Sequence, residues 1–226
     1  MFITSYMYIN TGPEENIKSL SKSDLEAYIK THYTADRFVI AGAGAINHNE
    51  LVALSEKYFN KLPKGAAEGA VALSMDPAIF TGSDKRIRFD SMNEAHVALA
   101  FQGASWTSEY AFPLMVMQTI LGSWDRSSSA GRNIASRLAQ DISEKELAHS
   151  YMTFNTCYKD TGLFGVYLVA PDNKLEDLMW YTLDNMVRLC HNVSDEEVTR
   201  AKTQLKANMI MQLDSFSQTC EVRVPL

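Results

Sequence analysis

The stretch SYMTFNTCYKDTGLFGVYLVA (residues 150–170) contains two short runs, 150–158 and 163–170, that are rich in β-branched, aromatic and apolar residues. Lys159-Asp-Thr-Gly162 stands between the two runs and has the Asp/Gly chemistry of a hairpin or short loop. The stretch therefore predicts two strands that follow one another directly along the chain.

The sequence around this pair predicts further strands at 37–44, 86–90 and 96–103, the first of them buried. The spacing of apolar residues and the capping signals predict helices that begin near Ser21 (with Asp24), Asn47 (with Glu50), Ser108, Ile134, Leu175 and Ser194 (with Glu197). The helix from Ser108 is expected to be buried, residues 122–133 to form a loop, and the last helix to reach about Leu213. Because strands neighbour strands and helices come in groups, the pattern favours an α+β fold over strict βαβ alternation.

Residues 63–85 change in character, with two prolines, three glycines and many small residues. Such a stretch is long for a loop inside a compact domain, and it is typical of a linker. We expect one domain over residues 1–78, the end of the linker at 79–85 and a second domain over 86–226.

The composition narrows the classes of function. The chain has 226 residues, a net charge of −6 and a pI near 5.4, which argues against nucleic acid as a partner. No apolar run approaches the roughly 20 residues of a transmembrane segment, and the first residues lack the pattern of a signal or transit peptide. Three widely spaced cysteines favour free thiols over a disulfide framework.

The five histidines give no local metal motif, because none has a second histidine within five positions. His48 and Glu50 are the nearest His/Glu cluster, but their side chains diverge at a helix start, where Glu50 is better suited to capping. The sequence therefore predicts no catalytic, cofactor-binding or metal-binding residue in this chain.

Three weaker candidates each have a structural interpretation that we favour. Gly42-Ala-Gly44-Ala-Ile-Asn47 lacks the third glycine of a dinucleotide loop, so its small residues are expected to pack against a helix that Asn47 caps. Cys157 and Cys190 are expected in the core and Cys220 in the tail, and the serines 127–129 lack a nucleophile elbow. Lys145 and His149, four residues apart, are interpreted as a helix end or loop.

Five stretches together resemble one family: 12–33, 80–106, 120–126, 136–169 and 197–214. Among them are GPEENI, GSWDR and FNTCYKDTGL, and in order they are similar to the pitrilysin-type zinc peptidases. That family includes the β-subunits of mitochondrial processing peptidases and the core proteins of the respiratory cytochrome bc complex. The resemblance implies antiparallel-rich sheets with helices on one side, and parts of two homologous domains, with residues 1–78 the end of the catalytic one.

The resemblance also implies a function. In the family, zinc is held by a His-x-x-Glu-His helix and a distant Glu, all N-terminal to the GPEENI segment, so this chain is expected to bind no zinc. The full protein would be a mitochondrial matrix endopeptidase that removes presequences as a heterodimer with an α-subunit, and this chain would be an inactive internal fragment of it. A non-catalytic core protein of the cytochrome bc complex and a truncated product that folds poorly are the alternatives. Many relatives have Arg-Gly-Leu-Ala-Tyr at 145–149, where this chain has Lys-Glu-Leu-Ala-His, so a substrate-binding role for Lys145 or His149 is not carried over.

Overall fold

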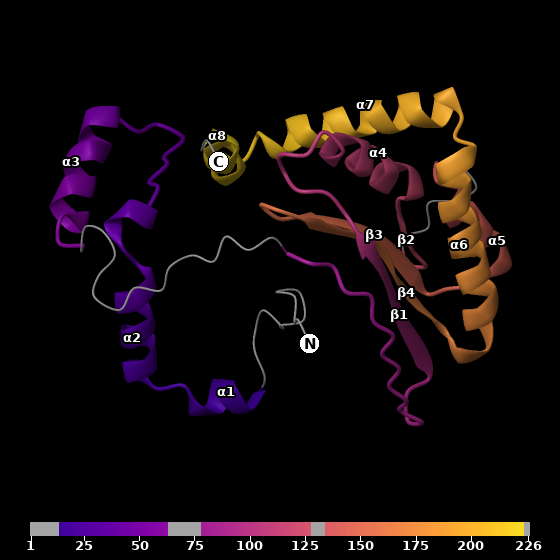
Figure 1. Cartoon of the computed structure of the whole chain (residues 1–226). Coiled ribbons are helices and arrows are strands. Elements are labelled where there is room, and N and C mark those ends of the chain that lie inside the picture. The colour runs from indigo at the N-terminus through magenta and orange to yellow at the C-terminus, as the bar shows by residue number, and fades with distance from the viewer. Residues whose placement is uncertain (1–13, 63–77, 128–133, 224–226) are drawn as a thin grey trace. The chain divides into compact units, whose positions relative to one another are not determined.

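The computed structural model describes residues 14–62, 78–127 and 134–223 (Figure 1). The chain divides into two compact units, residues 1–77 with 209–226 and residues 78–208. The helices are α1 (Glu14–Ser19), α2 (Lys22–His32), α3 (His48–Phe59), α4 (Ala111–Leu121), α5 (Arg137–Lys145), α6 (Leu175–His191), α7 (Asp195–Gln212) and α8 (Phe216–Arg223). The strands are β1 (Glu94–Gln102), β2 (Ser123–Asp125), β3 (Ser150–Cys157) and β4 (Gly162–Pro171), and the 3-10 turns are η2 (Ala35–Arg37) and η3 (Asp172–Lys174).

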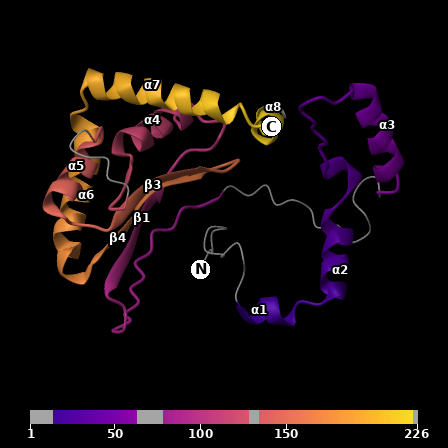
Figure 2. The same cartoon turned by 180° about the vertical axis from the view of Figure 1, so that it is seen from behind.

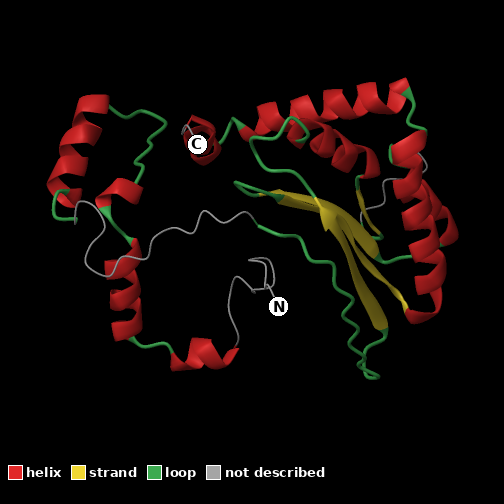
Figure 3. Ribbon diagram, in the orientation of Figure 1, coloured by secondary structure: helices red, strands yellow, loops and turns green. Residues whose placement is uncertain are grey.

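The second unit is built on a four-stranded sheet in the order β1-β4-β3-β2, and every pair of neighbours is antiparallel (Figure 3). The predicted hairpin is confirmed, because β3 pairs with β4 along its whole length, from Cys157 opposite Gly162 to Ser150 opposite Val169. The strand predicted at 96–103 is confirmed as β1, whose partner is β4. The sheet is thus the antiparallel one that the α+β prediction requires.

One face of this sheet carries the core. Alternate residues of β4 are buried, namely Phe164, Val166, Leu168 and Ala170, and they pack in one cluster with residues of the helices. The helices contribute Leu121 of α4, Leu138 and Ile142 of α5, and Leu178 and Leu189 of α6 to that cluster. Helices α4 to α6 lie on the same side of the sheet in Figures 1 and 2, as the resemblance implied.

The junction of α4, α5 and β3 contains a small buried polar network. The carbonyl oxygen of Leu121 accepts hydrogen bonds from the hydroxyl groups of Ser136 (2.6 Å) and Tyr151 (2.7 Å). Ser136 is also the N-cap of α5, since its Oγ accepts from the backbone N–H of Ala139 at 3.4 Å. Burial raises the pKa of Tyr151 to about 12, so its phenol stays a protonated donor at neutral pH.

The turn between α6 and α7 is fixed by the capping box that the sequence predicts. Glu197 accepts a hydrogen bond from the backbone N–H of Ser194 (3.2 Å), and the Ser194 hydroxyl accepts from the Glu197 N–H (3.2 Å). The same carboxylate forms a two-pronged ion pair with the Arg188 guanidinium, both N···O distances being 3.0 Å. Because of these hydrogen bonds the pKa of Glu197 is lowered to about 2.

The first unit has little interior. Thr34 is the one residue classed as buried in its described part, and an aromatic group links its segments through Tyr28, Tyr33, Phe38 and Phe59. The helices predicted at Ser21 and Asn47 are confirmed as α2 and α3, and the Asn47 side chain caps α3 by accepting from the Asn49 N–H at 2.9 Å.

Three predictions of secondary structure are wrong. Residues 37–44 and 86–90 do not form strands, and Val39, Ile87 and Phe89 are 63–70% exposed. A strand needs a partner for its backbone groups, and within the described ranges neither segment has one. The loop predicted at 122–133 begins instead with β2, which pairs with the start of β3. Most of the predicted linker, residues 63–77, lies outside the described residues.

Candidate functional site

The cysteines occupy three different environments, and all three are free. Cys157 ends β3 with its side chain buried, and burial raises the pKa of its thiol, which disfavours the nucleophilic thiolate. Cys190 is exposed on α6, so its predicted place in the core is wrong. Cys220 lies in α8 and is partly exposed, in agreement with its interpretation as a tail residue.

Ser127 closes a local turn, in which the carboxylate of Asp125 accepts its hydrogen bonds. Its backbone N–H and its hydroxyl both donate to Oδ1 of Asp125, at 2.8 and 2.6 Å. These hydrogen bonds lower the pKa of Asp125, so the carboxylate stays ionised and holds the serine in the turn. The serines at 128 and 129 lie outside the described residues.

Lys145 and His149 do not share a site. The Lys145 ammonium lies 3.5 Å from Asp141 and 4.7 Å from the centre of the Tyr181 ring, both of which belong to the helical layer. His149 lies beyond the C-terminus of α5, and its Nε2 is 3.8 Å from a carboxylate oxygen of Glu94 at the start of β1. The helix-end interpretation therefore holds for Lys145, which is the last residue of α5.

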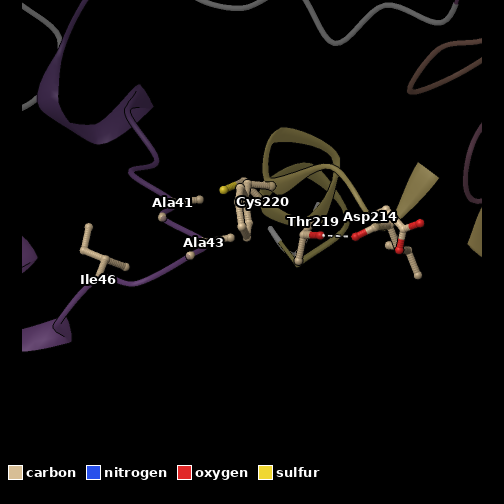
Figure 4. Close-up of a pocket in the computed structure, with 10 residues that line it drawn as sticks. Ala41, Ala43, Ile46, Asp214, Thr219 and Cys220 are labelled. Atoms are coloured by element: carbon tan, nitrogen blue, oxygen red, sulfur yellow. Dashed lines mark hydrogen bonds between the residues drawn. The ribbon is translucent and has the colours of Figure 1, made fainter. Parts of the chain in front are cut away.

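The glycine loop 42–47 packs as the sequence analysis expects, although no strand leads into it. A Cβ at Gly42 would lie 3.2 Å from the Leu51 side chain of α3, a tight contact that a larger residue would keep only if that side chain shifted. Gly44 has a φ of +125°, which few other residues adopt. A pocket of the first unit, drawn in Figure 4, lies between this loop and α8. Asp214 is the charged residue of its lining, and a carboxylate does not favour the phosphate groups of a nucleotide.

The histidines are dispersed over the fold. His32 stacks on Tyr28 with ring centres 4.2 Å apart, His48 begins α3 and His191 ends α6. Across the described segments, no three His, Cys, Asp or Glu side chains come together in a group that could hold a metal ion. The described residues therefore offer no set of ligands that fits a resident zinc ion.

The sheet face turned away from the helices is the most distinctive surface of the second unit. We call it the open face, and it carries Met152 and Phe154 of β3, Tyr167 of β4 and His96 of β1. Met152 is 55% exposed and Tyr167 39%, while the Tyr167 hydroxyl is 2.8 Å from Nδ1 of His96. A half-exposed apolar sheet face with a hydrogen-bonded polar pair suits contact with another protein surface, not chemistry.

The open face was not found from the sequence. Its residues alternate with core residues along each strand, and the alternation is visible in 150–158, but which residues become neighbours depends on the pairing of β1 with β4.

Within the described residues, no helix combines the length and the hydropathy that crossing a membrane requires.

Comparison with known sequences gives one consistent family. The chain is 46% identical over 210 residues to a probable mitochondrial-processing peptidase subunit beta of Arabidopsis thaliana, covering 93% of this chain and 40% of the relative. It is 45% identical over 214 residues to the mitochondrial-processing peptidase subunit beta of Lentinula edodes, covering 93% of this chain and 46% of the relative. The subunit beta of Rattus norvegicus is 44% identical over 210 residues, with 93% of this chain and 42% of the relative covered. The chain thus spans less than half the length of these relatives.

Comparison with solved structures supports the same fold. A chain of complex III2 from Candida albicans, solved with Inz-5 bound, superposes with a TM-score of 0.84 and 26% identity, covering 95% of this chain and 50% of that one. A protease from Helicobacter pylori has a TM-score of 0.68 at 19% identity, covering 92% of this chain and 49% of that one, and this match concerns the fold alone.

The family model described as the peptidase M16 inactive domain matches residues 19–205, which is most of the chain. This match agrees with the antiparallel sheet that has helices on one face, and with the similarity to the peptidase beta subunits. The chain therefore belongs to the peptidase M16 family, the pitrilysin-type family that its motifs resemble.

Proposed function

We propose that this chain is part of the β-subunit of a mitochondrial processing peptidase, a zinc endopeptidase that removes presequences from imported precursor proteins. The observation that carries the proposal is the identity of 44–46% over 93% of the chain to proteins of that name from a plant, a fungus and an animal. Because the chain spans less than half of those relatives, the activity belongs to the full protein.

The role of this portion is structural in our proposal. The described residues do not fit a zinc ion, and the matching family model is that of the inactive domain. We place the zinc ligands elsewhere in the full protein, and assign to this portion the support of the catalytic domain and of the partner subunit. Residues 1–78 would belong to the end of the first domain and residues 86–226 to the second.

The proposed partner is the α-subunit of the peptidase, and the proposed location is the mitochondrial matrix. An exposed apolar sheet face is costly for a protein that works alone, and an assembly would cover it. The net charge of −6 is compatible with basic presequences as substrates, which would bind between the subunits.

A second function is favoured by a separate observation. The likeness to a chain of complex III2 from Candida albicans covers 95% of this chain with a TM-score of 0.84. A non-catalytic core protein of the cytochrome bc complex would use the same fold as a scaffold. The identity to that chain is 26%, well below the identity to the peptidase subunits, so we rank it second.

The experiment combines assembly with metal content. The tagged chain is mixed with purified α-subunit, the mass of the complex is measured by light scattering, and zinc is measured in the chain alone. We expect a one-to-one complex, far less than one zinc per chain, and no chelator-sensitive cleavage of a presequence peptide. Gly165→Val, which cannot fit in the sheet, should abolish the complex, and Gly82→Val, in open space, should not.

The possible contradictions separate the two functions. Stoichiometric zinc together with cleavage by the chain alone would contradict the structural role. Incorporation of the tagged chain into the cytochrome bc complex of isolated mitochondria, without binding to the α-subunit, would replace the first proposal by the second.

A further inference from the structure

Within the described residues, β1 has β4 on one side and no strand on the other, which we call its free edge. The pairing with β4 shows which backbone groups of β1 point to this edge. Residue 103 continues β1, and its N–H donates to the carbonyl of Gly162, directly opposite, at 2.8 Å. In an antiparallel ladder hydrogen-bonded pairs alternate with non-bonded pairs, so the odd-numbered residues of β1 bond to β4. The N–H and C=O groups of the even-numbered residues, such as Glu94, His96 and Ala98, therefore point to the free edge.

The segment that precedes β1, residues 84–90, has the side-chain arrangement of a strand. Arg86 is 2.9 Å from Asp84, and Arg88 is 2.6 Å from Asp90, so both ion pairs join residues two apart on one side of an extended chain. Ile87 and Phe89 alternate with these charges, and each is 63% exposed. In both views of the fold this segment runs back along β1 (Figures 1 and 2).

The turn that joins the segment to β1 is already closed. The N–H of Met92 donates to the carbonyl of Phe89 at 3.1 Å across a turn with Asp90 and Ser91 at its centre. Met92 is even-numbered, like the residues of β1 whose N–H and C=O groups point to the free edge. The hydrogen bond that closes the turn therefore belongs to the same ladder that those groups would form. The next rungs of the same ladder would join Ile87 to Glu94 and Lys85 to His96.

We propose that residues 84–90 are a strap that closes onto β1 as a fifth strand in this register. Closure places Ile87 and Phe89 on the open face beside Met92 and satisfies the outward groups of Glu94 and His96. It also removes a bare edge of the kind that recruits other extended chains. The strap goes beyond the proposed function, since it concerns the sheet of this chain whatever the full protein does.

Amide hydrogen exchange on the full chain tests the strap, with two neighbouring proline variants as a matched pair. In the proposed register the N–H of Lys85 donates to His96, and the N–H of Arg86 points to solvent. Lys85→Pro removes the hydrogen bond from the Lys85 N–H to His96. Arg86→Pro removes the same positive charge but keeps every hydrogen bond of the ladder, because proline is tolerated where the N–H points outward from an edge strand. We expect the His96 amide, which faces Lys85 in this register, to exchange at least about tenfold faster in Lys85→Pro than in Arg86→Pro or the parent chain.

Three results would overturn the proposal. The first is free exchange of the Glu94 and His96 amides in the parent chain, whatever the odd-numbered amides of β1 do. The second is equal protection in both proline variants, which would mean a different register. The third is protection that grows with protein concentration, which would mean that a second copy of the chain covers the edge.

Discussion

Phe154 lies directly opposite Gly165 in the β3–β4 pair, with its ring atom Cζ 2.6 Å from the place where a Cβ on residue 165 would stand. The carbonyl oxygen of Leu99 on the other neighbouring strand is in contact with the same place. The aromatic ring therefore fills the space above a glycine that the close approach of three strands requires.

Gly165→Ala should destabilise the second unit by about 3 kcal/mol, because the added methyl group meets backbone that cannot move without breaking the ladder. The free energy of unfolding in urea measures the effect. Gly82→Ala is the matched control, since nothing lies within 4 Å of a Cβ there, and it should change the free energy by less than about 0.5 kcal/mol. Equal effects at the two glycines would refute the packing argument.

Glu146→Gly should stabilise the chain by about 1 kcal/mol. Glu146 ends α5 with a φ of +50°, a left-handed conformation that glycine adopts without strain. A higher midpoint of thermal unfolding is the expected result. Glu146→Ala removes the same exposed charge and keeps the Cβ, so it should give no increase; a gain of equal size would assign the effect to charge.

Glu197→Gln should remove a stabilisation that depends on pH. Hydrogen bonds from Arg188 lower the pKa of Glu197 from 4.5 to about 2 on folding, so the folded state favours the carboxylate. Its contribution is present above about pH 4.5 and is lost as the pH falls toward 2, with a size of about 2 kcal/mol. Urea unfolding of the parent chain and the variant should differ at pH 7 and converge near pH 2. Glu196→Gln, at the exposed neighbouring position, should show no such convergence.

Ser136 and Tyr151 should be coupled, because both donate to the carbonyl of Leu121. Tyr151→Phe alone leaves that carbonyl with the Ser136 hydroxyl, and should cost about 1 kcal/mol. Adding Ser136→Ala leaves the carbonyl without either donor, so the double variant should lose more than the sum of the two single losses. A double-mutant cycle on unfolding free energies measures the difference, and strict additivity would show that the shared acceptor is unimportant.

The elements that the sequence predicted correctly are those whose signals are local. The cap at Asn47, the capping box of Ser194 with Glu197 and the turn between β3 and β4 each depend on residues within a few positions. The helical spacing of apolar residues, which is also a local signal, predicted α6. These signals survive because the hydrogen bonds that they describe form within one segment.

The errors concern contacts between distant segments. Residues 37–44 and 86–90 have strand-like side chains, but a strand exists only where a partner pairs with it. Cys190 follows the apolar phase of α6 and still faces outward, because the core side of that helix is taken by Leu178 and Leu189. The absence of a local site residue stays a prediction. The open face could not be foreseen, since it depends on the β1–β4 register.

The order of the strands along the chain has a consequence for synthesis on the ribosome. Among the described strands β1 pairs with β4, and residues 103–161 must be made before that partner exists. The β3–β4 hairpin, by contrast, closes over a few residues, and a short loop costs the least chain entropy. The hairpin should therefore form first and act as the template onto which the earlier-made β1 folds back. Until then a nascent chain carries β1 without β4, and the edge that β4 later covers is a place for a chaperone to bind.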